Sequence, residues 1–181
     1  MGQPTRTDVR RKDRAVVDEA WIQELLERAA VGTLATVSDG ERFLHLNLFV
    51  FDRSVRVLYL HGAAEGRTNT NIRNEERVCF GVYEMGRLLP GDTANDMSVE
   101  YASVIVFGRA RVVADPEEAN RALEALLGKY FTHLQAGRDY RPIVADELAR
   151  TAVYRIEIDE WSGKRKQVGA DFPGAFYYGE R

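Results

Sequence analysis

The sequence contains little of several residues that would point to particular classes of protein. It has one cysteine, Cys79, and three histidines among 181 residues. A single cysteine excludes a disulfide within the chain, and three scattered histidines give no clustered ligand spacing, so we expect no metal site. Cys79 lies in the apolar alternation VCFGVY. This context favours a small buried side chain over a nucleophile.

Long apolar runs and an excess of one charge are also missing. No run approaches the roughly 18 apolar residues of a membrane-spanning helix, and the polar, basic N-terminal residues do not resemble a secretory signal. The 25 basic and 28 acidic residues give a net charge of -3, which provides no basic field for nucleic acid. We therefore expect a cytoplasmic, globular protein with neither a membrane nor a nucleic-acid partner.

The length suits a single domain with a sizeable core. We predict a polar leader over residues 1–15, one domain over residues 16–166, and a tail over residues 167–181 that packs on the surface as irregular structure. The leader carries the only basic cluster, RRKDR at Arg10–Arg14. This cluster has three possible roles: binding a phosphate, pairing with acidic residues of a partner subunit, or facing solvent.

Apolar periodicity predicts three main helices, a further helical turn, and six strands. The helices are expected at residues 18–30, 68–74 and 115–131, the helical turn at 144–150, and the strands at 31–37, 43–51, 55–60, 77–84, 101–113 and 153–158. Asp18 and Asp115 are expected N-caps, with Glu118 completing a capping box. Residues 85–98 are expected to form a loop long enough to be a lid or a partner contact.

The number of strands and the short turns between them predict the fold class. They favour a mainly β protein, an antiparallel β-barrel with peripheral helices, over a doubly wound parallel sheet. No GxGxxG follows the first strand, so a dinucleotide site of the Rossmann type is not expected.

The segment from Val55 to Asn74, VRVLYLHGAAEGRTNTNIRN, contains the main candidate site. An apolar strand leads into His61, Gly62, Gly66 and Arg67, and then into a helix that Thr68 or Asn69 would cap. A helix N-terminus and an arginine together suit a phosphate dianion. The alternative is an ordinary turn from strand to helix with a solvated arginine.

Four stretches resemble the flavin-binding split-barrel superfamily of pyridoxamine 5'-phosphate oxidase-like proteins, most closely its nitroimidazole reductase (Nim) branch. The stretches are RRKDR at residues 10–14, LYLHGAAEGR at 58–67, YASVIVFGRARVV at 101–113 and IDEWSGK at 158–164. The resemblance covers about residues 10–166. It implies a six-stranded, Greek-key split barrel that forms a homodimer, with two FMN molecules in clefts between the subunits.

The same resemblance implies which residues contact FMN. The backbone at two pairs of positions would line the isoalloxazine ring, Arg67 would hold the phosphate, and His61 would lie near both flavin and substrate as the candidate catalytic residue. The full set of implied positions is Thr36, Val37, Asn47, Leu48, His61, Gly62, Ala63, Arg67, Ser103, Trp161 and Lys164.

Some of these residues also have simpler interpretations. His61 could be a core or capped histidine, Trp161 could pack without contacting a cofactor, and Lys164 could belong to a solvated charge run with its basic neighbours. Relatives often carry lysine beside the phosphate arginine, where Thr68 and Asn69 stand here. The C-terminal segment DFPGAFYYGER lacks the Arg-X-His motif of relatives that oxidise pyridoxamine phosphate, which argues against vitamin B6 oxidation.

The function favoured by the resemblance is an FMN-dependent oxidoreductase that passes electrons from NAD(P)H to a small acceptor such as a nitroimidazole. His61 would donate a proton or hydrogen-bond the acceptor. Two alternatives stay open: a non-catalytic flavin-binding or flavin-sensing protein, and a split barrel that binds haem or a deazaflavin.

Overall fold

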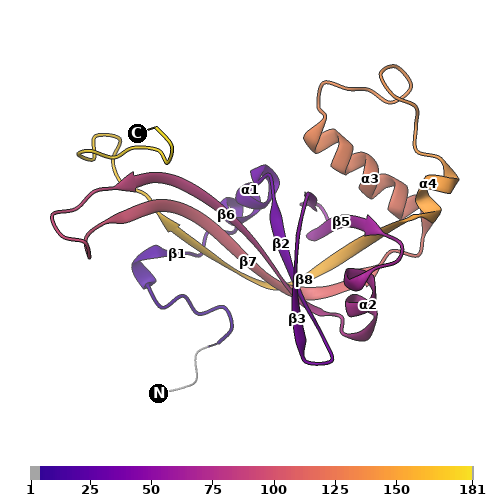
Figure 1. The fold of residues 1–181 in the computed structure, drawn as a ribbon, viewed down its shortest axis with the longest axis horizontal. Coiled ribbons are helices and arrows are strands. Elements are labelled where there is room, and N and C mark those ends of the chain that lie inside the picture. Colours follow the sequence, from indigo (N-terminus) through magenta and orange to yellow (C-terminus); the bar gives the residue numbers. More distant parts are fainter. Residues whose placement is uncertain (1–4, 181) are drawn as a thin grey trace. The chain divides into compact units, whose positions relative to one another are not determined.

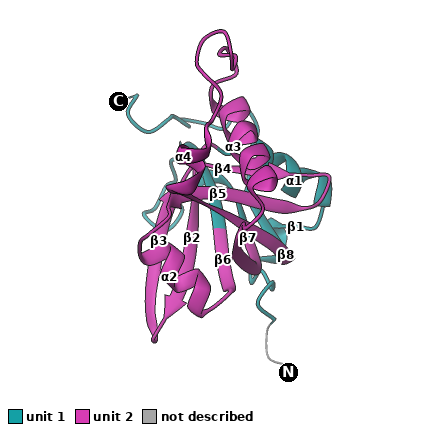
Figure 2. Cartoon of the chain, turned by 90° about the vertical axis from the view of Figure 1, so that its right-hand side faces the viewer, with its two compact units in different colours: residues 1–29, 81–105, 161–181 teal, residues 30–80, 106–160 magenta. Residues whose placement is uncertain are grey.

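The computed structural model describes residues 5–180 and shows a mainly β protein (Figure 1). The chain forms two compact units (Figure 2): unit 1 comprises residues 1–29, 81–105 and 161–181, and unit 2 comprises residues 30–80 and 106–160. The elements in chain order are η1 (Lys12–Arg14), β1 (Ala15–Val16), α1 (Glu19–Arg28), β2 (Gly32–Ser38), β3 (Glu41–Asn47), β4 (Phe49–Asp52), β5 (Val57–Ala63), α2 (Arg67–Asn74), β6 (Arg77–Leu89), β7 (Ser98–Val112), α3 (Pro116–Tyr130), α4 (Ala145–Ala149) and β8 (Thr151–Lys166).

The strands form one sheet whose order is β3-β2-β6-β7-β8-β5-β4, with β1 pairing on β8. Consecutive strands are often not neighbours, as a Greek-key arrangement requires. The predicted fold class is confirmed, but the described residues form eight strands rather than six. The expected strand 43–51 breaks at Leu48 into β3, which pairs with β2, and β4, which pairs with β5. The other additional strand is the two-residue β1.

Unit 2 is built around β5, in which Val57 to Leu60 are all buried because both faces of this strand are covered. Phe49 and Phe80 are fully buried and meet edge to face with ring centroids 4.9 Å apart. Gly32 allows this packing, since a Cβ there would lie 2.0 Å from the Phe80 ring. Gly32 begins β2, within one residue of the predicted start of this strand.

In unit 1, α1 begins at its predicted cap, because the Asp18 carboxylate accepts hydrogen bonds from the backbone N–H groups of Ala20 and Trp21. The described part of the tail contains no helix or strand and is tied down by Arg87. This side chain binds the carboxylate of Glu100 at 2.8 Å and donates to backbone carbonyl groups of the tail. The first four residues of the predicted leader lie outside the described part, and the predicted domain boundaries stay predictions.

Several element boundaries differ from those expected. Strand β6 continues to Leu89 and β7 begins at Ser98, so the expected loop over residues 85–98 is confined to residues 90–97. Strand β8 continues through the whole IDEWSGK segment. Cys79 is half-buried rather than buried. No helix in the described part of the chain has the length and apolar character that crossing a membrane would require.

Two helix starts also differ in detail. Asp115 caps α3 as predicted, but the Glu118 side chain does not turn back to complete a capping box. At α2 the N-cap is Gly66, with a φ of 147°, and no side chain caps the helix. Thr68 and Asn69, the expected caps, are buried in the first turn.

Candidate functional site

The segment around Arg67 in unit 2 has the geometry of an anion site. The chain leaves β5 at Ala63, turns at Gly66 and enters α2 with Arg67 as its first residue. The positive φ of Gly66 suits glycine, which has no side chain to cap the helix. The first N–H groups of α2 and its dipole therefore have no capping side chain, and this is the environment that binds phosphate.

The side chain of Arg67 is half-exposed, and releasing it from its ion pair to bind a ligand would cost little free energy. Its guanidinium lies 2.5 Å from the carboxylate of Glu41 and 4.9 Å above the ring of Phe43. Both partners of the ion pair are well exposed, so this pair is worth about 0–1 kcal/mol. A phosphate dianion at the helix start can compete with such a pair.

The remaining side chains of α2 fix the helix to the β2–β3 hairpin. Thr68 lies 3.1 Å from Nδ1 of His45, Asn69 donates to the carbonyl of Ala64 at 2.9 Å, and the buried Asn71 donates to the Thr36 hydroxyl at 2.9 Å. The Thr36 side chain is thus a structural acceptor. Its neighbour Val37 is exposed.

His61 and Asn47 are joined by a hydrogen bond. The Asn47 amide donates to the backbone carbonyl of His61 at 2.6 Å, which joins the end of β3 to β5. Gly62 follows on β5, where a Cβ would lie 3.3 Å from the Tyr154 ring, and Ala63 is exposed at the end of the strand. The sequence had suggested a turn at these positions, but all three of His61, Gly62 and Ala63 belong to β5.

A cavity of about 500 Å³ opens beside His61, within unit 2. Its walls are mostly apolar and come largely from one face of α3. The lining residues are Leu48, His61, Leu123, Leu126, Leu127, Tyr130, Phe131, Ile143, Glu147 and Thr151. The apolar stripe of α3 was interpreted as a packing face alone, yet part of it lines this cavity. A volume of this size lies within the range of about 300–1,000 Å³ typical of ligand sites.

The surroundings of His61 favour its neutral imidazole form. Burial, followed by the nearby His45, lowers its pKa from the ordinary value. Its Nδ1 atom is buried without a hydrogen-bond partner. Because a buried polar atom without a partner is costly, a hydrogen bond to this nitrogen would be favourable.

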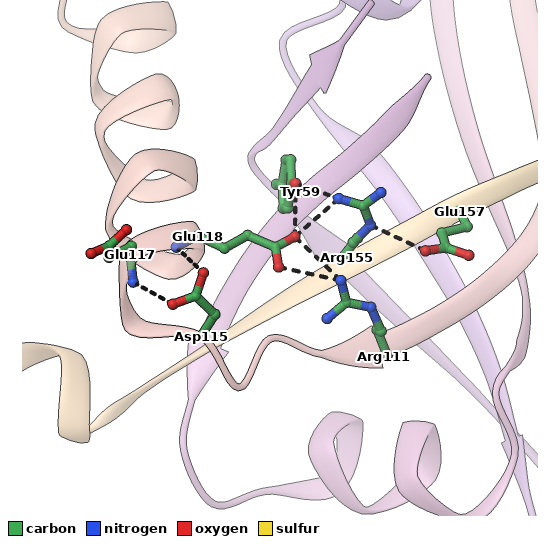
Figure 3. A network of polar contacts seen from close by, with 7 residues as sticks. All are labelled: Tyr59, Arg111, Asp115, Glu117, Glu118, Arg155 and Glu157. Atoms are coloured by element: carbon green, nitrogen blue, oxygen red, sulfur yellow. Dashed lines mark hydrogen bonds and ion pairs between the residues drawn. The ribbon is translucent and has the colours of Figure 1, made fainter. Parts of the chain in front are cut away.

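The N-terminal end of α3 is held against the sheet by a polar network (Figure 3). The Glu118 carboxylate accepts hydrogen bonds from the Tyr59 hydroxyl at 2.9 Å, from Arg155 at 3.0 Å and from Arg111 at 3.2 Å. Partial burial alone would raise the pKa of Glu118, but these hydrogen bonds outweigh it and leave the pKa lowered. The network connects α3 to β5, β7 and β8.

The C-terminal end of α3 is held at β4. The Tyr130 hydroxyl accepts from the backbone N–H of Phe49 at 3.0 Å and lies 2.9 Å from the carbonyl oxygen of Ala30. Lys129 donates to the carbonyl of Phe49 at 3.1 Å, and burial lowers its pKa to about 8. The cavity wall is therefore a helix fixed at both ends. All but one of these contacts join residues more than 30 positions apart, so the sequence did not reveal them; the exception is Arg111 to Glu118, seven positions apart.

Three implied site residues, Ser103, Trp161 and Lys164, belong to unit 1. The Ser103 hydroxyl donates to the backbone carbonyl of Lys164 at 3.5 Å, and the Lys164 ammonium lies 5.4 Å from the ring centre of Tyr101. Trp161 is half-buried on β8. Its odd separation from Lys164 along the strand places the two side chains on opposite faces. Among residues 5–180 no group of His, Cys, Asp or Glu is arranged to hold a metal ion.

Comparison with known proteins identifies the family of this chain. The model of a family described as pyridoxamine 5'-phosphate oxidase matches residues 18–165. The chain belongs to this family. The match includes every implied site residue, from Thr36 to Lys164, and confirms the resemblance found in the sequence. No curated protein matches the chain.

Solved structures of family relatives show the same fold. The flavocytochrome Anf3 from Azotobacter vinelandii has a TM-score of 0.79 and 22% identity, covering 91% of this chain and 75% of that one. An FAD and heme binding protein from Mycobacterium smegmatis has a TM-score of 0.75 and 21% identity, covering 86% and 74%. A protein assigned to 5-nitroimidazole antibiotic resistance from Bacteroides thetaiotaomicron has a TM-score of 0.69 and 18% identity, covering 83% and 86%.

Proposed function

We propose that this family member is a flavin-dependent oxidoreductase that binds FMN. The observation that carries the proposal is the uncapped start of α2, where Gly66 and Arg67 offer backbone N–H groups and a guanidinium to a phosphate. When bound, FMN would accept a hydride from NADH or NADPH and pass electrons to a small acceptor such as a nitroimidazole. The M. smegmatis relative is described as binding FAD, which supports a flavin as the cofactor.

The residues of unit 2 would bind and orient the ligands. Backbone groups near Thr36, Val37, Asn47 and Leu48 would line the ring, as the family resemblance implies. The neutral form of His61 is favoured, so it would position an acceptor by a hydrogen bond rather than donate a proton as a cation. The apolar wall of α3 would exclude water from that contact.

We also propose that two copies of the chain form the working unit, with the cofactor between them. Leu44 and Leu46 alternate along β3 and expose 60% and 69% of their surface, and Leu48 and Val37 are exposed nearby. Such an apolar sheet face is typical of a subunit interface. Sedimentation should show a dimer, and Leu46→Glu should shift it toward a monomer. A wild-type monomer at micromolar concentration would contradict this arrangement.

The direct test is anaerobic reduction of the FMN-loaded protein by NADH or NADPH, followed by addition of a nitroimidazole. Absorbance near the flavin maximum should fall with a donor and recover with the acceptor. Flavin that stays oxidised with both donors would refute catalysis and leave the non-catalytic flavin-binding alternative.

Variants at the anion site test the binding argument separately. Arg67→Ala should weaken FMN binding about 10- to 100-fold, because it removes a charge-assisted hydrogen bond worth about 1.5–3 kcal/mol. Glu41→Gln should leave FMN binding equal or tighter, since it releases Arg67 from its ion pair. Unchanged affinity in Arg67→Ala would mean that the phosphate is held elsewhere.

A second candidate, haem binding, is favoured by the cavity beside His61. The His61 imidazole would hold the iron of a haem, and the apolar residues of the cavity would surround its ring. The Anf3 and M. smegmatis relatives are described as haem-containing, which supports it. Titration with hemin should give a shifted, saturable Soret band that His61→Ala removes and the exposed-site variant His133→Ala retains. No saturable band would reject this candidate and leave the flavin proposal intact.

A further inference from the structure

The proposed phosphate site at the start of α2 has a hydroxyl group next to its arginine. Arg67 supplies one positive charge, whereas a phosphate monoester carries a charge of about −1.5 to −2 at pH 7. The following residue, Thr68, is buried, and its hydroxyl lies 3.1 Å from Nδ1 of His45 on β3. His45 therefore brings a titratable side chain to the first turn of α2.

His45 belongs to a row of half-buried side chains on β3. Phe43, His45 and Asn47 alternate with exposed residues along this strand and so lie on one face of it. The Arg67 guanidinium lies 4.9 Å from the centre of the Phe43 ring, and the Asn47 amide donates to the carbonyl of His61. The row connects the phosphate site to His61, with His45 at its centre.

The charged and titratable groups around His45 come from three strands and a helix. Arg67 on α2 is already paired with Glu41, the carboxylate at the beginning of β3. His61 on β5 is near enough that His45 contributes to its lowered pKa. On β2 the residue opposite His45 is Leu34, which is apolar and fully buried. Within the described part of the chain His45 forms no ion pair with a carboxylate, so a charge on its ring would not be neutralised.

A proton on His45 would favour a phosphate in two ways. Histidine is the side chain whose charge ordinarily changes between about pH 5 and 8. An imidazolium carries hydrogen on both nitrogens, so Nδ1 of His45 would donate to the Thr68 oxygen and leave the hydroxyl hydrogen of Thr68 for another acceptor. The positive charge would add to that of Arg67 and of the helix dipole.

We propose that His45 is a positioning residue for the cofactor phosphate, which in its protonated form directs the Thr68 hydroxyl to the anion and adds a positive charge to the site. This inference rests on the proposed function. Because linkage is reciprocal, binding of the anion and protonation of His45 favour each other. A charge on His45 also opposes protonation of His61. The affinity for FMN therefore rises as the pH falls, until the phosphate itself takes up a proton near pH 6.

FMN and riboflavin together test this coupling, because riboflavin has the same ring and no phosphate. His45→Asn keeps an amide that can hydrogen-bond the Thr68 hydroxyl but carries no charge. Near pH 8 this variant and wild type should bind FMN with similar affinity, and near pH 6.5 wild type should bind it about three- to tenfold more tightly. Riboflavin should show no such difference. The matched control His133→Asn, at an exposed position, should behave as wild type at both pH values.

Calorimetry provides a second measurement that needs wild type alone. FMN binding near pH 7, measured in buffers of different ionisation enthalpy, should show a net uptake of protons, and riboflavin binding should show none. Three results would each overturn the role of His45: no proton uptake with FMN, equal FMN affinity of His45→Asn and wild type near pH 6.5, or the same affinity difference with riboflavin.

The failure of this proposal and the failure of the proposed function give different results. If wild type binds FMN more tightly than riboflavin and His45→Asn does so equally at every pH, only the role of His45 is wrong. If FMN does not bind, or binds no more tightly than riboflavin, both the phosphate site at α2 and its coupling to His45 are refuted.

Discussion

Replacing Glu118 should destabilise the protein strongly for a single change of one charged side chain. This carboxylate accepts three hydrogen bonds and is only 16% exposed, and its partner Arg155 is 20% exposed. Tyr59, the third member, is 8% exposed. Glu118→Ala would remove the acceptor shared by these groups.

The expected cost follows from this partial burial. Exposed ion pairs contribute about 0–1 kcal/mol, and breaking a fully buried pair costs about 3–5 kcal/mol. Arg155 keeps a contact with Glu157 at 3.3 Å and one with the Tyr59 hydroxyl at 2.9 Å, so its charge is not left without partners. We therefore expect a loss of about 2–3 kcal/mol, which lowers the melting temperature of a chain of this size by about 4–12 °C.

The adjacent residue provides the matched control. Glu117 stands one position earlier on α3, its side chain is 87% exposed, and it lies 3.8 Å from Arg121. Glu117→Ala should change stability by no more than about 0.5 kcal/mol. Thermal unfolding of both variants by circular dichroism at pH 7 measures the difference.

Measuring the stability difference between wild type and Glu118→Ala at several pH values tests whether the charge of Glu118 causes it. The pKa of Glu118 is lowered in the folded state, so its stabilisation is present above its unfolded pKa near 4.3 and is lost as the pH falls through the folded pKa. The gap between wild type and Glu118→Ala should therefore shrink in acid. If Glu118→Ala and Glu117→Ala melt together at pH 7, the reasoning on partial burial is refuted.

Two further predictions concern stability. Gly108→Ala should lower the free energy of unfolding by about 1–3 kcal/mol or more, because the new Cβ would lie 2.1 Å from a backbone carbonyl oxygen. Gly128→Ala, at a position on α3 with open space around it, should raise the free energy of unfolding by about 0.5–1 kcal/mol. Chemical denaturation measures both, and equal effects would contradict the packing. The pKa of Lys129 is lowered to about 8, so the unfolded state binds more protons between pH 8 and about 10, and stability should rise over that window in wild type but not in Lys129→Met. A flat wild-type profile would show that Lys129 is not desolvated.

Local chemistry made some of these features predictable from sequence. The caps at Asp18 and Asp115 were found because a cap depends on residues within one turn. The capping box at Glu118 was wrong because the Glu118 side chain accepts hydrogen bonds from Tyr59 and Arg155, which lie on strands distant in the sequence. A pattern of neighbouring residues does not show such long-range contacts.

In the candidate site, too, features set by neighbouring residues were predicted and features set by long-range contacts were not. Arg67 was placed correctly at a helix start, since glycine and the end of an apolar strand mark that position in sequence. Its ion pair with Glu41 and the cavity beside His61 depend on contacts with β3 and α3, which only the folded chain brings together. The extra length of β6 and β8 was missed for a related reason, because strand pairing extends through residues whose sequence suggests loops.

Because α3 is held at both ends, the shape of the cavity and the surroundings of Arg67 depend on different helices. Leu123, Leu127 and Phe131 form the cavity wall, while Arg67 stands on a different helix that is tied to the β2–β3 hairpin. Exchanging those three side chains for larger or smaller ones would change the shape of the cavity without altering Arg67 or its helix. A combinatorial library confined to these three positions would therefore vary the ligand cavity and leave the proposed phosphate site unchanged.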